Sequence, residues 1–550
     1  MDIIAVDIET TVRGDRSSPY LDDILLIQVN FGDRIEVSTK VEDFEDVLGD
    51  PSVLKVFQNG CFDIGFLECW SFDLDIRNIW DTMIVERLLT AGTSQRSDLG
   101  TIVEKYCDVV LDKEVRKTFA AHAGALTATQ LEYAENDVRY LIEVYKCQLE
   151  EIKSRDMTRV ADLENTLVPI VAEMELLGIG FDPKAWESML QTEGNRLPEL
   201  ELQVQQQLSE TFTMDLFSGV QGTINLNSPT QLLRAFRRAG VDIEDTSEDT
   251  MKKCSHPAAK MLLEYRECAK RLQWDYPSYV NPKTGRIHPD YKQVGARTGR
   301  FSCTSPNLQN VPREQRFRNM FVAREGRKMI TADYSQQELR VLAQYCQDPA
   351  LIETCTSEDP HLKNARLIYK DETIQKSDER RRTAKNTNFA LMYGAGAKTF
   401  ANAAGISLSD ARVFLKELKR LYPGAFTWGH KSWQFLVQNG YTTTLLGRRR
   451  YFPEVMNDPG KYATVARNTP IQGSSADMMK SAMIEVTEKL RNYDANLLLC
   501  VHDELVVEAA TSQADEVSKV VEESMRVAGE KYVQVVPIKA DATIADTWTK

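Results

Sequence analysis

Acidic residues near the start of the chain have the type and spacing needed to bind a divalent cation. Asp7 and Glu9 lie two residues apart in an apolar run that predicts a β-strand, so both side chains should point to one face. Two carboxylates on one face repel each other unless a cation lies between them, and oxygen ligands suit Mg²⁺ or Mn²⁺. A D-x-E pair is also common on solvated strands, so this pair alone leaves both interpretations open.

Two further patches each add a carboxylate in an apolar context. Asp63 ends the run N-G-C-F-D, and Asp137 ends the run Y-A-E-N-D that starts at Tyr133. The second run is predicted to be helical, which places Tyr133 and Asp137 on one face at i, i+4. Asp81, in the sequence W-D-T-M, fits a helix cap as readily as a site residue.

Another set of acidic positions lies in the C-terminal part of the chain. Asp333 follows an apolar run that predicts a strand, and Glu338 is placed five residues later in the first turns of a predicted helix. Asp503 and Glu504 lie between two apolar runs, which predict a hairpin with Asp503 at its tip. A lone Asp at a strand end is usually a turn residue, but burying adjacent acids between apolar strands is costly without a cation.

A basic and aromatic helix is predicted between these two acidic patches. Arg381, Lys385, Phe389 and Tyr393 recur every four residues, so they form one stripe that is basic at one end and aromatic at the other. Guanidinium and ammonium groups suit phosphates, and rings suit a base and a sugar, although a solvated basic face would have the same spacing. With Asp333 and Asp503 holding two Mg²⁺ ions, such a helix would suit a triphosphate substrate.

The N-terminal motifs, Asp-x-Glu followed by N-x-x-F-D and Y-x-x-x-D, resemble in this order the 3′–5′ exonuclease superfamily of the DEDDy type. The resemblance covers nearly all of residues 1–150 and implies an α/β, ribonuclease H-like domain. It also implies two metal ions at one site, with Tyr133 orienting the attacking water. The implied metal ligands are Asp7, Glu9, Asp63 and Asp137.

The later motifs resemble motifs A, B and C of the family A DNA polymerases. They read D-Y-S-Q-x-E-L-R, R-x-x-x-K-x-x-x-F-x-x-x-Y-G and V-H-D-E-L, and the resemblance spans about residues 157–510. It implies an α+β right-hand polymerase over residues 151–550. Within it we expect a thumb at about 185–290, fingers at about 361–440, and a palm made of the remainder.

This second resemblance implies a role for each matching residue. Asp333 and Asp503 would hold two Mg²⁺ ions, with Mn²⁺ as an alternative, and Glu504 would be an accessory acid. Lys385 would be the general acid for pyrophosphate, and Glu338 the steric gate against a ribose 2′-OH. The residues implied to bind the incoming dNTP are Arg381, Lys385, His361, Phe389, Tyr393, Glu338 and Gln336.

Primer–template DNA is the other partner that the resemblance implies. Residues that would touch it are Arg300, Gln309, Asn310, Asn468, Gln472 and His502. Relatives often carry Arg four residues before the Asn of N-x-P-x-Q-G, where this chain has Thr464, so one template contact stays open.

The function that we expect is a template-directed DNA polymerase with 3′–5′ proofreading. One alternative is a 3′–5′ exonuclease whose C-terminal region binds DNA without polymerising, and another is a single-subunit RNA polymerase. The charged residues kept in all three polymerase motifs weigh against the first alternative. Glu338 and the fused exonuclease favour DNA over RNA synthesis.

Composition places few limits on this reading. The 550 residues are 42% hydrophobic and 27% charged, as expected for a globular chain, and no apolar run is long enough to predict a membrane span. The net charge of −14 belongs to residues 1–150, which hold 14 basic and 29 acidic residues, so it does not exclude DNA binding elsewhere. Ten scattered cysteines indicate a reducing, cytoplasmic location.

Three expectations concern organisation. The chain starts directly at the exonuclease motifs, which suggests a phage-type replication enzyme. The thumb region shows no insertion of the kind that binds thioredoxin. We expect a monomer.

Overall fold

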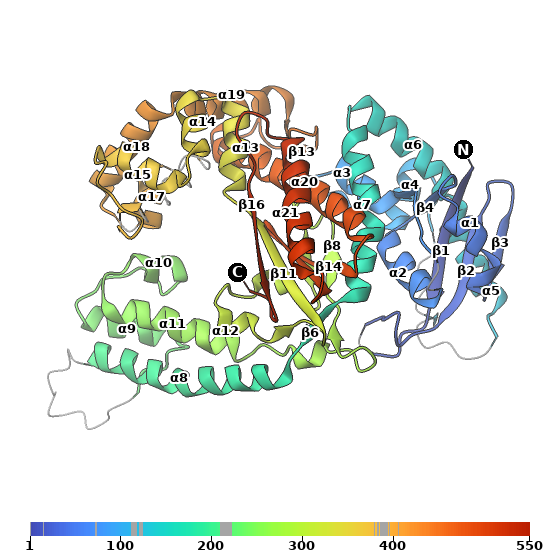
Figure 1. Cartoon of the computed structure of the whole chain (residues 1–550), viewed down its shortest axis with the longest axis horizontal. Coiled ribbons are helices and arrows are strands. Elements are labelled where there is room, and N and C mark those ends of the chain that lie inside the picture. The colour runs from blue at the N-terminus through green and yellow to red at the C-terminus, as the bar shows by residue number, and fades with distance from the viewer. Residues whose placement is uncertain are drawn as a thin grey trace.

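The computed structural model describes residues 2–549 except for 15, 72–73, 112–117, 120–124, 210–222, 379, 382–383, 385–393, 395 and 405. In Figure 1 an N-terminal sheet lies on the right, a second sheet in the centre, and two groups of helices on the left. Among the described residues, no helix has both the length and the apolar character required to span a bilayer.

The N-terminal unit is built on a five-stranded sheet with the order β3-β2-β1-β4-β5. β1 runs antiparallel to β2 and parallel to β4, and β4 is parallel to β5. The strands are β1 (Ile3–Thr10), β2 (Ile24–Asn30), β3 (Ile35–Ser38), β4 (Leu54–Phe57) and β5 (Ile79–Asp81). The helices are α1 (Glu45–Gly49), α2 (Gly60–Trp70), α3 (Thr82–Leu89), α4 (Leu99–Cys107), α5 (Ala128–Arg139) and α6 (Leu141–Ser154).

Alternation along β1 decides which side chains face which layer. Ile4, Val6 and Ile8 join one buried apolar cluster, whereas Ala5 joins a second cluster. Because successive side chains of a strand point to opposite faces, Asp7 and Glu9 share the face of Ala5. The predicted strand with both acids on one face is therefore confirmed.

A single long helix joins the two halves of the chain. α7 (Thr158–Leu177) ends at Gly178, whose positive φ of 56° suits glycine, as the sequence predicts. In the N-terminal half α7 packs against α2 and β5, and in the C-terminal half against α20 (Ala463–Leu490) and β14 (Ala495–Val501).

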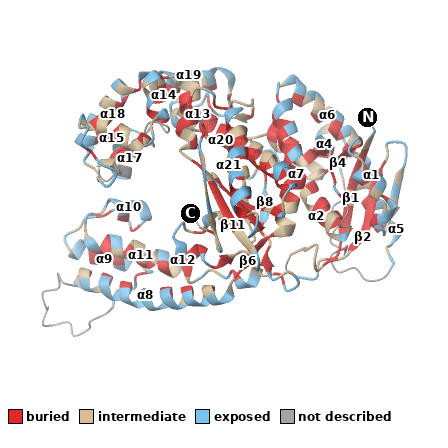
Figure 2. Ribbon diagram, in the orientation of Figure 1, coloured by how far each residue is buried: buried red, intermediate tan, exposed pale blue. Residues whose placement is uncertain are grey.

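The C-terminal half centres on an antiparallel sheet with the order β14-β15-β11-β16. Its other strands are β15 (Glu504–Ala510), β11 (Arg327–Tyr334) and β16 (Ala540–Ala545), and α20 and α21 (Ala514–Glu530) pack beside it. Figure 2 shows buried residues along β11 and β14 and exposed residues along much of α8. Smaller sheets are formed by β6 (Ile179–Phe181), β7 (Arg286–Ile287) and β10 (Phe321–Val322), by β8 (Asp290–Lys292) and β9 (Ser302–Thr304), and by β12 (Tyr441–Thr443) and β13 (Arg449–Tyr451).

Two helical groups flank this central sheet (Figure 1). The lower group has an apolar cluster of its own and contains α8 (Pro183–Ser209), α9 (Pro229–Arg238), α10 (Glu248–Lys253) and α11 (Pro257–Arg271). The upper group contains α13 (Gln337–Cys346), α14 (Pro349–Thr356), α15 (Pro360–Tyr369), α17 (Ala397–Ala404), α18 (Leu408–Leu421) and α19 (Pro423–Asn439). The short α12 (Gln315–Arg318) precedes β10.

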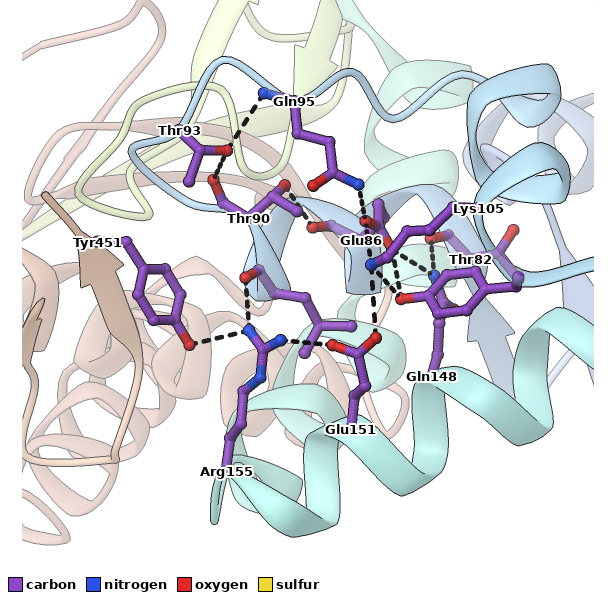
Figure 3. Close-up of polar contacts among 12 residues, drawn as sticks. Thr82, Glu86, Thr90, Thr93, Gln95, Lys105, Gln148, Glu151, Arg155 and Tyr451 are labelled. Carbon is purple, nitrogen blue, oxygen red and sulfur yellow. Dashed lines mark hydrogen bonds and ion pairs between the residues drawn. The ribbon is translucent and has the colours of Figure 1, made fainter. Parts of the chain in front are cut away.

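A polar clasp ties the N-terminal unit to β13 (Figure 3). The Arg155 guanidinium donates to the Tyr451 hydroxyl at 3.0 Å and forms an ion pair with Glu151 at 2.5 Å. The backbone N–H of Tyr451 donates to the carbonyl of Ala91 at 2.8 Å. The bonds that cross to β13 are therefore a side-chain bond to a hydroxyl and a backbone bond, while the ion pair lies within the N-terminal unit.

Four buried charged groups hold α7 against α20. Glu164 of α7 accepts from Lys480 at 2.6 Å and from Arg448, and Arg448 also bonds Asp477 at 2.7 Å. All four residues are buried, so each charge depends on its partners. Although burial alone would raise the pKa of Glu164, Lys480 and Arg448 hold that pKa below its ordinary value.

Replacing Glu164 should therefore cost much of the stability of the chain. In Glu164→Gln, the buried cations Lys480 and Arg448 are left with only the carboxylate of Asp477. Because one buried positive charge then lacks a partner, we expect a loss of about 3–5 kcal/mol in the free energy of unfolding. Urea denaturation measures this loss. The control is Glu143→Gln, whose pair with Lys146 is exposed, and which should change stability by less than about 0.5 kcal/mol. Equal effects in the two variants would contradict the assignment.

Candidate active sites

Three carboxylates meet beside the N-terminal sheet. One ligand atom each from Asp7, Glu9 and Asp137 lies within 4.8 Å of the others. β1 supplies the first two, and α5 supplies Asp137 together with Tyr133 on the same helix face. α5 begins at a capping box, in which Thr127 accepts from the backbone of Gln130 and the Gln130 side chain accepts in return. Tyr133 and Asp137 also line a hollow of about 390 Å³.

Asp63 approaches the same cluster from α2. It is buried, and its Oδ1 accepts the backbone N–H of Ile8, which lies between Asp7 and Glu9, at 3.2 Å. The geometry therefore brings all four predicted acids to the end of β1. Three oxygen-donor groups this close together fit a hard divalent cation such as Mg²⁺ or Mn²⁺.

Asp81 is a structural cap. Its carboxylate accepts the backbone N–H groups of Ile84 at 3.0 Å and of Gly60 at 2.7 Å, so it fixes the starts of α3 and α2 together. Burial raises the pKa of this acid, and the backbone donors oppose that rise. Of the two roles that the sequence left open, the structure supports the cap.

Gln28 is a residue that the sequence analysis missed. It lies opposite Asp7 on β2 and is fully buried, yet neither polar atom of its amide has a hydrogen-bond partner among the described residues. Cross-strand partners point to the same face, so Gln28 faces the side that carries the acids. No motif pointed to it, because a glutamine in an apolar strand has no signature of its own.

In the C-terminal half, a hairpin brings two distant acids together. Asp503 lies in the turn between β14 and β15, and its carbonyl accepts the backbone N–H of Tyr334 at 3.1 Å. Asp333, next to Tyr334 near the end of β11, is therefore adjacent to the turn. The predicted hairpin, the strand before Asp333 and the position of Glu338 in the first turn of α13 are all confirmed.

Glu504 is satisfied by protein groups. Its two oxygens accept from Arg318 at 3.1 and 3.2 Å, and Trp548 donates to one of them at 2.6 Å. Arg318 and Glu504 are both buried, and the guanidinium lies 4.3 Å from the Trp548 ring centroid. The cation that balances this buried acid is thus an arginine, which the sequence analysis did not identify.

Two arginines lie near the turn that carries His502 and Asp503. Arg313, also missed from the sequence, lies 3.6 Å from the Asp503 carboxylate. Burial, together with Arg300 and Arg313, lowers the pKa of His502. This local charge suits an anionic ligand.

The turn after Asp333 is held by other residues of the same motif. Tyr334 donates its hydroxyl to the carbonyl of Met525 at 2.6 Å, and buried Arg340 donates to the carbonyls of Ser335 and Pro537. Gln336 has a positive φ of 55° and places Glu338 at the start of α13, where it pairs with Arg300 at 2.5 Å. Tyr334 and Arg340 are therefore structural parts of the motif.

The remaining predicted residues lie on several elements. Arg381 donates to Asp359 at 2.8 Å, next to His361 at the start of α15. Gln309 and Asn310 are in a 3₁₀ turn, and Asn468 and Gln472 are in α20. Buried oxygens of Gln336 and Asn468 have no hydrogen-bond partner within the described part of the chain. Lys385, Phe389 and Tyr393 lie outside the described residues.

The fold thus consists of an α/β unit followed by a central antiparallel sheet between two helical groups, and each part carries its own group of acids. Residues 194–550 match the model of DNA polymerase family A, and residues 1–153 match that of a 3′–5′ exonuclease. The chain therefore belongs to DNA polymerase family A and carries a 3′–5′ exonuclease domain.

Among the similar proteins are two bacterial DNA polymerases I. That of Aquifex aeolicus is 30% identical, with 98% of this chain and 93% of that protein covered. That of Pseudomonas aeruginosa is 30% identical, with 91% of this chain and 57% of that protein covered. The chain also covers 48% of the Thermus filiformis enzyme, so it spans about half the length of several relatives.

A solved structure agrees in fold along nearly the whole chain. It is the POL domain of Pol1 from M. smegmatis in complex with DNA primer–template and dNTP. The TM-score is 0.81 at 25% identity, with 99% of this chain and 95% of that chain covered. The fold class expected from the sequence is therefore confirmed.

In the absence of substrate, the affinity for a divalent metal ion should fall when one of the three clustered N-terminal carboxylates is removed. In a chain that also carries Asp333→Asn, we expect Asp137→Asn to lower Mn²⁺ affinity about tenfold or more, because one of three close oxygen ligands is lost. Titration calorimetry measures the dissociation constant. Asp33→Asn, an exposed acid of the same unit, is the control and should leave affinity unchanged. Equal affinity in all three proteins would refute the site.

The adjacent acids Asp503 and Glu504 should respond differently to neutralisation. Glu504→Gln leaves Arg318 buried without its charge partner, so we expect a loss of about 3–5 kcal/mol in the free energy of unfolding. Asp503→Asn changes a partly exposed side chain and should cost less than about 1 kcal/mol. Urea denaturation of both variants tests this difference, and a reversed order would contradict the structural role of Glu504.

Proposed function

We propose that this protein is a template-directed DNA polymerase that adds dNTPs to a primer 3′ end and proofreads with a 3′–5′ exonuclease. The observation that carries the proposal is the bond between the turn at Asp503 and the backbone beside Asp333, which joins two acids from distant parts of a family A chain. The structural neighbour in complex with primer–template and dNTP supports the same substrates.

Asp333 and Asp503 are the residues that would hold metal ions at the polymerase site, with Glu504 kept nearby by Arg318. Two Mg²⁺ ions, with Mn²⁺ as an alternative, would supply activation of the primer 3′-OH and stabilisation of the pyrophosphate charge. Arg381 and His361 would bind the triphosphate, which requires Arg381 to exchange Asp359 for phosphate oxygens. Lys385 would donate a proton to the pyrophosphate, and Phe389 and Tyr393 would pack against the nucleotide.

Nucleotide selection is assigned to residues at the start of α13. Glu338 would exclude a ribose 2′-OH, and its pair with Arg300 keeps its carboxylate in place. The unpaired buried oxygen of Gln336 supports a ligand contact, because such atoms are rarely left without a partner.

The DNA contacts would come from donors near the hairpin and from α20. Arg300, Gln472 and His502 would reach the minor groove, where acceptors at equivalent places let donors check pairing without reading sequence. The unpaired Asn468 oxygen supports a template contact, and Gln309 and Asn310 would position a strand.

At the exonuclease site, Asp7, Glu9, Asp63 and Asp137 would hold two Mg²⁺ ions. These would supply a hydroxide nucleophile and stabilise the leaving 3′ oxygen. Tyr133, on the same helix face as Asp137, would orient the attacking water.

The finer assignments are also part of the proposal. They are an exonuclease domain at 1–150, a polymerase domain at 151–550 with the thumb and fingers given above, a monomeric cytoplasmic enzyme, and phage-type replication as its role. The alternative is an exonuclease with a DNA-binding region that does not polymerise. It predicts no primer extension in the presence of dNTPs.

Extension of a labelled primer–template with Mg²⁺, with and without dNTPs, tests the function. The wild type should extend with dNTPs and shorten without them, since each site has its own acids. Asp503→Asn should lose extension and keep shortening, whereas Asp7→Ala should do the reverse, each by a factor of about 10² or more. Chelation by EDTA should abolish both activities. A wild-type primer that shortens under every condition would favour the alternative.

A further inference from the structure

A loop of the exonuclease domain reaches across to the polymerase half. It comprises residues 11–14 and 16–23 and directly follows the β1 segment that carries Glu9. Asp22 is buried and ties the loop internally, because its carboxylate accepts the backbone N–H groups of Arg13 and Ser18, each at 2.6 Å. A loop closed on itself in this way can transmit a contact at its tip to the strand that bears the site.

Among the described residues of this loop, Arg16 makes the contact with the largest separation in sequence, 289 residues. Its guanidinium donates to the carbonyl of Ser305, and it lies 5.2 Å from the ring centroid of Tyr279. Ser18 accepts from Asn281 at 3.2 Å, and the Tyr20 ring lies 5.1 Å from that of His288. Three of the loop's described side chains, those of Arg16, Ser18 and Tyr20, thus contact the polymerase half.

Ser305 belongs to the segment that leads to the polymerase site. Two residues after it, Asn307 caps the 3₁₀ turn Leu308–Asn310. Three residues after this turn, Arg313 lies 3.6 Å from the carboxylate of Asp503. A chain of contacts therefore runs from Glu9 at one site to Asp503 at the other.

The space behind the loop is not tightly packed. A cavity of about 260 Å³ is lined by residues from both halves, among them Phe62, Glu175 and His288. On this side the loop contacts cross beside the cavity, next to Cys61, which packs against the apolar clusters of both halves. The clasp around Arg155 differs, because its guanidinium is also paired with the Glu151 carboxylate of the same unit (Figure 3). Arg16 has no carboxylate partner among the described residues.

We propose that Arg16 is a positioning residue that couples the two sites and sets the share of primer ends that reach the exonuclease. This inference rests on the proposed function. The planar guanidinium is required because it bonds a carbonyl while stacking on a ring, which lysine cannot do in the same way. Neither reaction needs Arg16 itself, since it lies at the contact between the halves and not among the acids.

The experiment uses the full chain and three readouts. Idling turnover, the conversion of a dNTP to dNMP at a paired primer end, requires both sites in succession. Digestion of a single-stranded oligonucleotide reports the exonuclease alone, and primer extension reports the polymerase alone. In Arg16→Ala we expect idling turnover, relative to extension, to fall about fivefold or more, with the other two rates within about twofold of wild type.

Two further variants sharpen the test. Arg13→Ala is the matched control, because Arg13 lies in the same loop and pairs within it, with Asp23. It should leave all three readouts unchanged. Tyr279→Leu removes the ring under Arg16 from the polymerase side, so it should reproduce the effect, and the double variant should be no worse than either single one.

Several results would overturn the inference. Unchanged idling in Arg16→Ala, equal loss in Arg13→Ala, or additive losses in the double variant would each do so. A parallel fall in single-strand digestion would show that the loop shapes the exonuclease site itself. Failure of the wild type to extend or to digest would instead reject the proposed function. The wild-type measurements therefore test the proposed function, and the variant measurements test the role of Arg16.

Discussion

The pairing of Glu164 inside the protein is the constraint on which the rest of the architecture depends. A buried carboxylate needs cations close by, and here they come from α20 and from the residue before β13. These partners fix α7 against α20, which packs beside the central sheet, while α7 also packs against α2 and β5 of the exonuclease unit. Both candidate active sites are therefore positioned relative to one helix, which carries none of the candidate site residues.

The same rule separates structural acids from acids suited to metal binding. Glu164, Asp81 and Glu504 are buried and each is satisfied by protein donors, either arginine and lysine or backbone N–H groups. Asp7, Glu9 and Asp137 instead bring three ligand atoms within 4.8 Å of one another, an arrangement that like charges tolerate when a cation is present. Burial alone therefore does not separate the two kinds of acid; closeness to other carboxylates does.

Local features of the fold were predictable because they depend on short stretches of sequence. Hydrophobic periodicity and turn residues predict three of these features. They are the strand with Asp7 and Glu9 on one face, the helix ending at Gly178, and the hairpin with Asp503 in its turn. The partner of Glu504 was not predictable. Arg318 lies 186 residues away, and its approach depends on how β11, β15 and the C-terminal Trp548 pack together. Gln28 was missed for the same reason, since its importance comes from the β1–β2 register.

Two of the contacts between the halves, the Arg155 clasp and the Arg16 contact, differ in kind, and this difference bears on how the sites communicate. The Arg155 clasp crosses the junction with a bond to a hydroxyl and with a backbone bond, so breaking it would leave these polar groups without partners. Arg16 bonds a neutral carbonyl beside a cavity, where water can replace the lost acceptor at small cost. One junction therefore holds the exonuclease unit in place, while the other can yield. A loop whose contacts can open is the better place to change the transfer of the primer end between the sites. Changes there leave the packing of α7 around Glu164 intact.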